Sequence, residues 1–481
     1  METLHGTART EVSRLIGPAG HASGPRHRGL VSALQRVAPL LVLALAGCAR
    51  VRPAPIDPAA AAATLTARRL DQPGLVRFLG AMGEHPHGRF GLRALTLVAV
   101  YERPDLRIRT TEADVAAGQV VLARQLPNPT LSLSPTFNAT QPVPSPIKVG
   151  PVIRFLVSNF GARQAGIAAA RARDAAARDV IAAAAWQERS AVRDALLTLW
   201  LDRRALRLKR LAADDARQEQ ALIARRATAG MLAETVLARA EAAADRARFA
   251  AAEATGRIGA DRARLAAAIG MPAAALRGVS LSFAAFAHPS APAPDRWPAL
   301  VRAAITARPQ VAAALARYRA ADDALRQAVD SQFPGISIGP GYHYDQGDSK
   351  FILSLSLPLP VLNQHQGQIA IARAQRRLAA ARFERAQARV LAQIDAAAAA
   401  WRGSRDTLLA ARRLDAIAAR RAAQAAQAYR LGATGRLRLV EAEGQAILAR
   451  EQLLTAEGQR LRALAALADA LHHRVFREMS A

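Results

Sequence analysis

Two stretches of the chain alternate between apolar and polar residues. After Lys350, the run FILSLSLPL places every second residue, from Phe351 to Leu359, on one apolar face and the serines on the other. The run TLSLSPTF, which starts at Thr130, alternates in the same way. Successive side chains of a β-strand point to opposite faces, so this period of two predicts strands. Long Pro-free runs rich in Ala and Arg predict helices elsewhere.

The same plan occurs twice along the chain. Pro104 opens a helical stretch that stops before Pro129, and Pro309 opens one that stops before Pro334, with an offset of 205 residues between the copies. Each copy continues with two strands and one long helix. The expected strands cover about 129–138, 148–158, 335–344 and 350–359, and the helices about 162–228 and 367–431. At 1.5 Å per residue, each helix spans roughly 100 Å.

Each long helix breaks at a glycine and reverses into a shorter partner. The breaks lie near Gly230 and Gly432, and an alanine follows ten residues after each, at Ala240 and Ala442. Two unrelated helix ends are the alternative, because glycine commonly terminates helices. The matched flanks favour a duplicated helical hairpin. The predicted fold is therefore mainly α with a small membrane β part, built from a repeated strand-strand-helix-helix unit.

This plan divides the chain into six segments. We expect a signal peptide, an N-terminal linker or anchor segment, the first repeat, a linker, the second repeat and a C-terminal tail. Their ranges are 1–47, 48–94, 95–275, 276–307, 308–472 and 473–481.

Arginine dominates the charge of the chain. The formal net charge is +28, and Lys148, Lys209 and Lys350 are the only lysines. A basic chain raises the possibility of nucleic-acid binding, so an Arg-rich nucleic-acid-binding coiled coil is a remote alternative. The arginines are spread evenly, however, which favours solvated helix faces and no nucleic-acid partner.

The single cysteine, Cys48, follows the apolar run VAPLLVLALAG, and arginines precede that run. This pattern predicts a lipoprotein signal peptide whose cysteine becomes the lipidated first residue, carrying diacylglycerol and an N-acyl chain. A buried free cysteine in a short core helix is the alternative. Because Ala49 rather than Asp follows, we expect anchoring in the outer membrane of a Gram-negative bacterium, with the chain extending into the periplasm.

The strands explain how such a chain crosses a bilayer. An open sheet in lipid leaves the backbone groups of its edges unpaired, at a cost of several kcal/mol each. One chain offers four strands, so closure requires more than one copy. Three copies give a 12-stranded β-barrel wide enough for a water-filled lumen.

With its lipobox, its doubled plan, the strand entry at Asn128-Pro129 and the two Gly-centred hairpins, the chain resembles the TolC-like outer-membrane efflux family from about 95 to 472. The run from Tyr342 to Ala370 is most similar to the lipoprotein CzcC-like branch, which serves heavy-metal efflux. The resemblance implies a homotrimer with a β-barrel on a long α-helical barrel. It also implies a periplasmic adaptor and an inner-membrane pump, of the RND type or another, as partners.

The resemblance also implies site residues at the periplasmic tip. Leu437 and Glu441 correspond to the ring that closes the aperture, whereas Arg438 stands where some members carry a second acid. Glu441 as an ordinary exposed acid is the alternative. The grooves expected to accept the adaptor contain Gly230, Leu237, Ala240, Gly432, Leu439 and Ala442.

No catalytic constellation or phosphate-binding loop occurs, so we expect a channel and not an enzyme, without a cofactor. The pairs His85 and His87, and His472 and His473, form a weak metal site or, more simply, solvated surface histidines. Two functions remain open: an efflux channel for heavy-metal cations or small toxic compounds, and a TolC-type exit duct for secreted proteins. A resistance pump and an adaptor encoded nearby would favour the first.

Overall fold

The computed structural model describes residues 51–86, 88–137, 139, 147–158, 160–333, 335–345 and 347–476. The contacts divide the chain into two units, residues 1–62 and 63–481. The signal peptide and Cys48 lie outside the described residues. Helix α2 (Pro58–Thr66) contains the boundary between the units, and everything below concerns the second unit.

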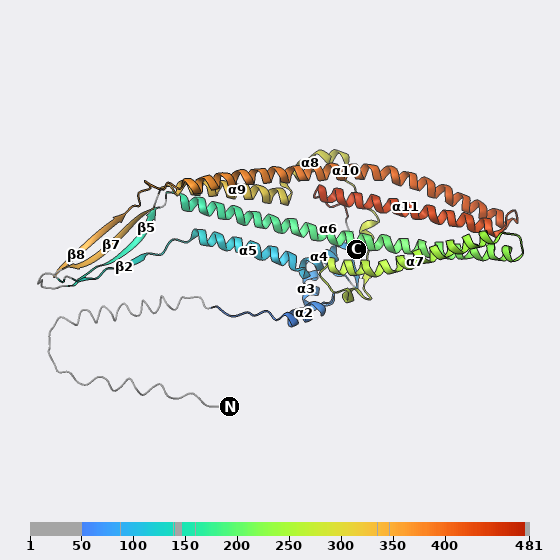
Figure 1. The fold of residues 1–481 in the computed structure, drawn as a ribbon, viewed down its shortest axis with the longest axis horizontal. Helices are drawn as coiled ribbons and strands as arrows, with labels where there is room; N and C mark the ends of the chain where they lie inside the picture. The colour runs from blue at the N-terminus through green and yellow to red at the C-terminus, as the bar shows by residue number, and fades with distance from the viewer. Residues whose placement is uncertain are drawn as a thin grey trace, which may run out of the picture. The chain divides into compact units, whose positions relative to one another are not determined.

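Two long helical hairpins form most of the second unit, and they lie side by side with their tips at the same end (Figure 1). The first hairpin joins α6 (Ala162–Thr228) to α7 (Glu234–Ala268), and the second joins α10 (Gln366–Arg430) to α11 (Arg436–Ala470). The long helices have 67 and 65 residues, and each partner has 35. These matching lengths show the duplication directly.

Both hairpins turn by the same glycine-dependent geometry. Gly230 and Gly432 have φ of +72° and +73°, which glycine adopts without strain. The residue after each glycine donates its N–H to a carbonyl five residues back, over 2.9 Å at Met231 and 2.8 Å at Ala433. This bond is typical of a helix that ends in a left-handed glycine. The predicted breaks at the two glycines are therefore helix ends of one kind.

Two shorter helices extend the long ones into a row. Both α5 (Pro104–Arg124) and α9 (Pro309–Asp330) begin with a proline, whose fixed φ suits a first helical position. Helix α5 contacts α6, α6 contacts α9, and α9 contacts α10. The row α5-α6-α9-α10 therefore has two outer helices, α5 and α10.

The strands form one antiparallel sheet. It contains β2 (Thr130–Leu133), β3 (Thr136–Phe137), β4 (Ile147–Val149), β5 (Pro151–Ser158), β7 (Ile336–Asp345) and β8 (Asp348–Ser356). Both β4 and β5 pair with β7, and β2 and β3 pair with β5 and β4, so the six strands occupy four positions across the sheet. Pro135 separates β2 from β3, because proline donates no hydrogen bond to a ladder.

The last strand is shorter than its pattern predicted. It ends at Ser356, so Leu357 and Leu359 do not belong to it. Pro358 and Pro360 follow, and proline cannot continue the hydrogen-bonded ladder.

The described residues of the segments expected as linkers and tail contribute to a folded core. Residues 48–94 contain α3 (Pro73–Ala81), the strand β1 (Arg89–Phe90) and the start of α4 (Leu92–Glu102). Residues 276–307 contain α8 (Trp297–Ala307), and their strand β6 (Ser280–Leu281) pairs with β1 in parallel. Apolar side chains explain this arrangement, because described residues of these segments and of the tail pack in one buried core with α6, α7 and α11. Their core members include Leu75, Leu79, Leu281, Phe286, Val475 and Phe476.

Candidate functional site

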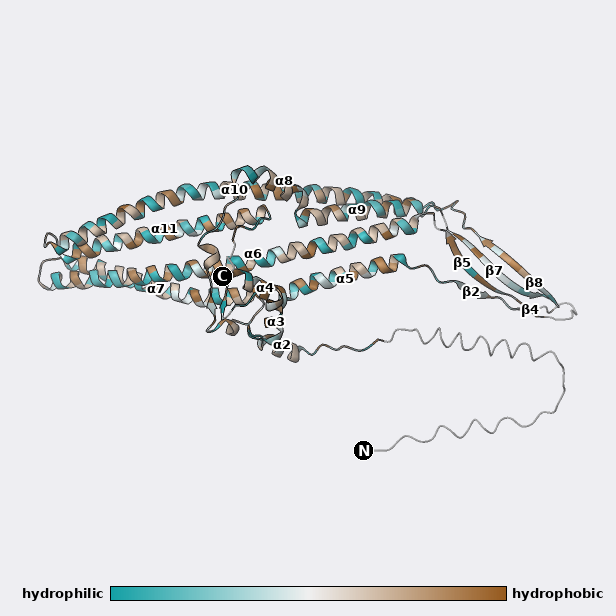
Figure 2. Cartoon of the chain, turned by 180° about the vertical axis from the view of Figure 1, so that it is seen from behind, coloured by the Kyte–Doolittle hydropathy of each residue, from teal (hydrophilic) through white to brown (hydrophobic). Residues whose placement is uncertain are grey.

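The strand register separates the sheet into an uncharged face and a charged face. Leu131 lies opposite Ile153, Phe155 opposite Ile338, and Ile338 opposite Leu355, so these side chains share one face. By the same alternation, that face also contains Leu133, Phe137, Ile147, Tyr342, Phe351 and Leu353. No charged residue of the described strands lies on it. Figure 2 shows the hydrophobic residues along β5 and β8.

All charged residues that the structure describes in these six strands lie on the opposite face. These are Lys148, Arg154, Asp345, Asp348 and Lys350, together with His343. Serines, threonines and glycines share this face with three apolar residues, Val152, Leu156 and Ile352. An uncharged face suits lipid and a charged face suits water, as in transmembrane barrels. The sheet therefore has the two surfaces that a water-filled channel wall requires.

Glycines on the charged face allow close packing there. A Cβ placed at Gly341 would lie 2.8 Å from Val152 Cγ2, and one at Gly339 would lie 3.1 Å from Arg154 Cγ. The side chains of β5 thus extend over glycines of the neighbouring β7. Crowding on one face, relieved by missing side chains, is what the inner face of a curved sheet requires.

The predicted gate residues lie at the start of α11. Leu437 is half-buried, and the Glu441 carboxylate lies 3.7 Å from the Arg438 guanidinium one helical turn away. Arg438, which stands where some members of the family carry a second acid, thus lies within ion-pair distance of Glu441. The two gate candidates share one turn of helix near the tip.

The predicted docking residues do not form one accessible set. Leu237, Ala240 and Ala442 are partly exposed, and Gly230 and Gly432 are exposed at the tips. Leu439, however, is only 7% exposed. Within one chain, Leu439 is therefore covered by its neighbours. Ala442 does line a hollow of about 330 Å³ between α10 and α11, with Leu414 and Leu448.

Two acids of α6, Asp215 and Glu219, lie near the first turns of α11, and neither was predicted as a site residue. Asp215 Oδ2 occupies the space that a side chain at Gly444 of α11 would need. Burial, followed by the nearby charges of Glu443 and Glu219, raises the pKa of Asp215 to about 6. Burial and the Glu441 charge likewise raise the pKa of Glu219. The pairing of the two long hairpins near their tips thus brings carboxylates together.

His472 is not a solvated surface residue. Its ring stacks on Trp186 at 3.9 Å between centroids, and its Nδ1 is buried without a hydrogen-bond partner among the described residues. Burial, and then the Arg308 charge, lower its pKa. His85 lines a separate hollow, and its neighbour His87 is outside the described residues. Within the described ranges, no group of three or more His, Cys, Asp or Glu side chains could hold a metal ion.

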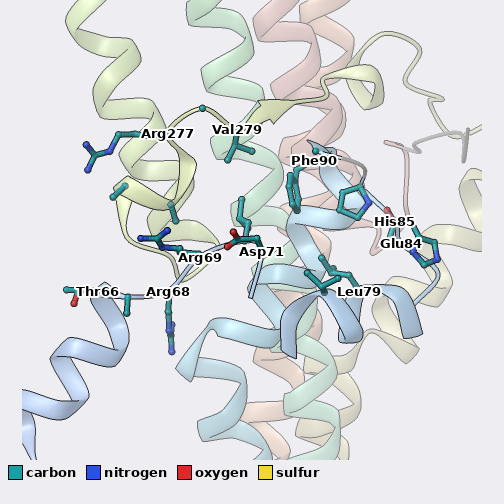
Figure 3. Close-up of a pocket in the computed structure, with 18 residues that line it drawn as sticks. Thr66, Arg68, Arg69, Asp71, Leu79, Glu84, His85, Phe90, Arg277 and Val279 are labelled. Atoms are coloured by element: carbon teal, nitrogen blue, oxygen red, sulfur yellow. The ribbon is translucent and has the colours of Figure 1, made fainter. Parts of the chain in front are cut away.

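The hollow that contains His85 has a volume of about 950 Å³. Figure 3 shows its labelled residues, among them Asp71 beside Arg69. A second hollow, of about 620 Å³, lies between α9 and α10 and has five arginines in its lining. None of the helices in the described part is long and apolar enough to span a membrane.

Three solved structures share this fold. The chain is 18% identical to the VceC outer membrane protein of Vibrio cholerae, covering 80% of this chain and 96% of that one, with a TM-score of 0.63. It is 18% identical to the MtrE channel of Neisseria gonorrhoeae in its open state, covering 81% of this chain and 91% of that one, with a TM-score of 0.61. It is 19% identical to CusC, covering 79% of this chain and 91% of that one, with a TM-score of 0.63. No curated protein sequence matches the chain.

The family model described as "Outer membrane efflux protein" matches residues 98–271 and 300–472. The two matched ranges contain the two hairpins and the whole sheet, and they make up most of the sequence. The predicted resemblance to TolC-like efflux proteins is thereby confirmed, and the chain belongs to the outer membrane efflux protein family.

Proposed function

We propose that three copies of this chain close into an outer-membrane channel that conducts substrates passively from the periplasm to the exterior. The observation that carries the proposal is a matched pair of free edges. One side of β8 is unpaired among the described strands, as is one side of β2 and β3. Joining these edges between copies gives hydrogen-bond partners to the backbone N–H and C=O groups of both edges, as a bilayer requires.

The helix row supports the same closure. On α5, the apolar side chains of Ile108, Val115 and Leu122 are 53%, 60% and 66% exposed, and they recur every seven residues. On α10, at the other end of the row, Ile371 and Leu378 are also exposed and seven residues apart. A seven-residue apolar repeat is the pattern by which helices pack side by side. Contact between α10 of one copy and α5 of the next would cover both stripes.

The number of copies follows from the size of the barrel. Each sheet has four strand positions, so three copies supply twelve strands. Barrels of about eight strands are filled by their own side chains, whereas wider ones can enclose water. Twelve strands would therefore give an open lumen, continuous with a tunnel made by the long helices.

The tips of the two hairpins are the proposed contact with a periplasmic adaptor and, through it, an inner-membrane pump. Gly230 and Gly432 present exposed turns, and a side chain there would meet no atom within 4 Å, so a partner helix can approach closely. Leu237 and Ala240 on one hairpin and Ala442 on the other would line the contact. The cargo class is small toxic compounds or heavy-metal ions, as the CzcC-like resemblance implies.

Lipidation of Cys48 is proposed as the anchor, since the lipobox pattern is the only cysteine-containing motif in the chain. A Cys48→Ser variant should incorporate no radiolabelled fatty acid. Incorporation into that variant would contradict the proposed anchor.

Light scattering in detergent and conductance in a planar bilayer test the channel. The expected results are the mass of three chains and stable ion-conducting steps. Leu122→Glu with Leu378→Glu should lower the trimer fraction, whereas Arg302→Glu, on the separate helix α8, should not. A monomeric, non-conducting wild-type protein would overturn the proposal.

A further inference from the structure

The charged face of the sheet contains one arginine whose charge nothing nearby balances. Arg154 lies on β5, opposite Thr130 of β2. It makes no ion pair or hydrogen bond with any described residue. The stretches that the description omits near the sheet, 138 and 140–146, contain no acidic residue. No carboxylate of the described residues therefore pairs with this guanidinium.

The other charges of this face cancel one another. Asp345 Oδ2 lies 3.3 Å from Lys148 Nζ and 3.2 Å from Lys350 Nζ, and Asp348 lies 4.0 Å from Lys350. Two lysines and two aspartates thus neutralise each other near the β7–β8 turn. Arg154 is far from them along the strand, because its neighbour Val152 already pairs with Gly341, four residues before Asp345. The net charge of the face is consequently that of Arg154.

The surroundings of Arg154 place it where the wall is crowded. Its Cγ lies 3.1 Å from the position of a Cβ at Gly339, so the arginine stem crosses over the next strand toward β8. In the proposed trimer this is the inner face, and three symmetry-related arginines would surround one axis. A ring of arginines without carboxylates attracts anions and repels cations.

We infer that Arg154 makes the strand section of the channel selective for anions, so that the favoured cargo is anionic: small organic acids or metal ions carried as anionic complexes. The inference rests on the proposed function, because the ring exists only in the assembled trimer. It narrows the cargo class, since a free divalent cation would meet three like charges at this level. A carboxylate or an anionic complex would be stabilised there.

Reversal potentials of the reconstituted full-length trimer, measured across a potassium chloride gradient, test the inference. Wild type should favour chloride, and Arg154→Gln should lower the chloride-to-potassium permeability ratio by about twofold or more, because a unit charge within a Debye length acts on a passing ion. Arg154→Glu should reverse the preference. Arg154→Lys keeps the charge and should stay close to wild type.

Arg302→Gln, on α8 outside the sheet, is the matched control and should leave the ratio unchanged. Comparing the trimer fractions of the variants separates selectivity from assembly. A conducting wild type that favours potassium, or an Arg154→Gln trimer with the wild-type ratio, would overturn this inference and leave the proposed channel standing. A wild type without conductance would overturn both.

Discussion

The carboxylate of Asp469 accepts hydrogen bonds of 2.9 and 2.8 Å from the guanidinium of Arg193, whose side chain is 1% exposed. The pair joins the middle of α6 to the end of α11 and thereby ties the two repeats together. Ser190 and Trp186 donate to the same carboxylate. Burial alone would raise the pKa of Asp469, but the bonds from Arg193 and its other donors outweigh it and lower the pKa.

Breaking this pair should destabilise the protein strongly. Arg193→Ala removes the buried arginine and leaves the partly buried Asp469 without its main partner. Breaking a buried pair in this way costs about 3–5 kcal/mol. The measurement is the thermal midpoint of the helical circular dichroism signal in detergent. Glu457→Gln removes a more exposed pair with Arg204 and should cost about 0–1 kcal/mol. Equal thermal midpoints for the two variants would show that the Arg193–Asp469 pair stabilises the protein no more than the exposed pair does.

The two faces of the sheet predict unequal effects of a new charge. Leu355→Arg places a cation on the uncharged face, where mid-bilayer arginine costs about 2–4 kcal/mol. Ser354→Arg places it on the face shared with Lys350 and Arg154. The trimer yield in outer-membrane extracts should therefore fall further for Leu355→Arg. A larger loss for Ser354→Arg would mean that the faces are assigned the wrong way, and equal yields would mean that neither face meets lipid.

Small residues at the gate should open the tip. Leu437→Ala with Glu441→Ala removes an apolar side chain and an acid from one turn of α11. We expect higher conductance than wild type without any adaptor, and a chloride-to-potassium permeability ratio above that of wild type, because the acid at the mouth is gone. Glu219 is unsuitable as a control because it lies in the field of Glu441. Glu112→Ala, an exposed acid of α5, should leave conductance unchanged, and wild-type behaviour of the double variant would refute this gate.

The raised pKa of Asp215 predicts a pH effect on the contact between α6 and α11. An acid that holds its proton more tightly when folded favours the folded state at low pH. The stability that protonated Asp215 contributes to the folded state should be lost as the pH rises from 3.8, the ordinary pKa of an aspartate, to about 6. Above pH 6 it stays lost. Asp215→Asn should therefore raise the thermal midpoint at pH 7 and change it little at pH 4.

Asp214→Asn is the matched control for that experiment. Asp214 is exposed and pairs with Arg217 on its own helix, so its removal should not stabilise the protein at pH 7. If the Asp215 and Asp214 variants respond alike, the carboxylate cluster does not control this contact.

Much of the fold could be predicted from local patterns. The prolines at 104 and 309 begin helices, the glycines at 230 and 432 end them, and the alternating runs form strands, because each of these depends on backbone preferences of a few neighbouring residues. Local patterns did not predict that the segments described as linkers contribute residues to a buried core. Their burial depends on distant partners, as where Phe286 packs in one core with Leu196 of α6.

Some features of the candidate site also followed from local patterns, whereas others depended on the tertiary structure. The sequence alone determined that Leu353 and Leu355 share a strand face and that Leu437 and Glu441 share a helix turn, since period and spacing decide both. Only the tertiary structure decided that Leu439 is buried, that Asp215 occupies the space beside Gly444, and that Arg154 has no ion-pair partner among the described residues. Those facts depend on the register between strands and on helices more than 200 residues apart, and no local pattern encodes which distant side chains will meet.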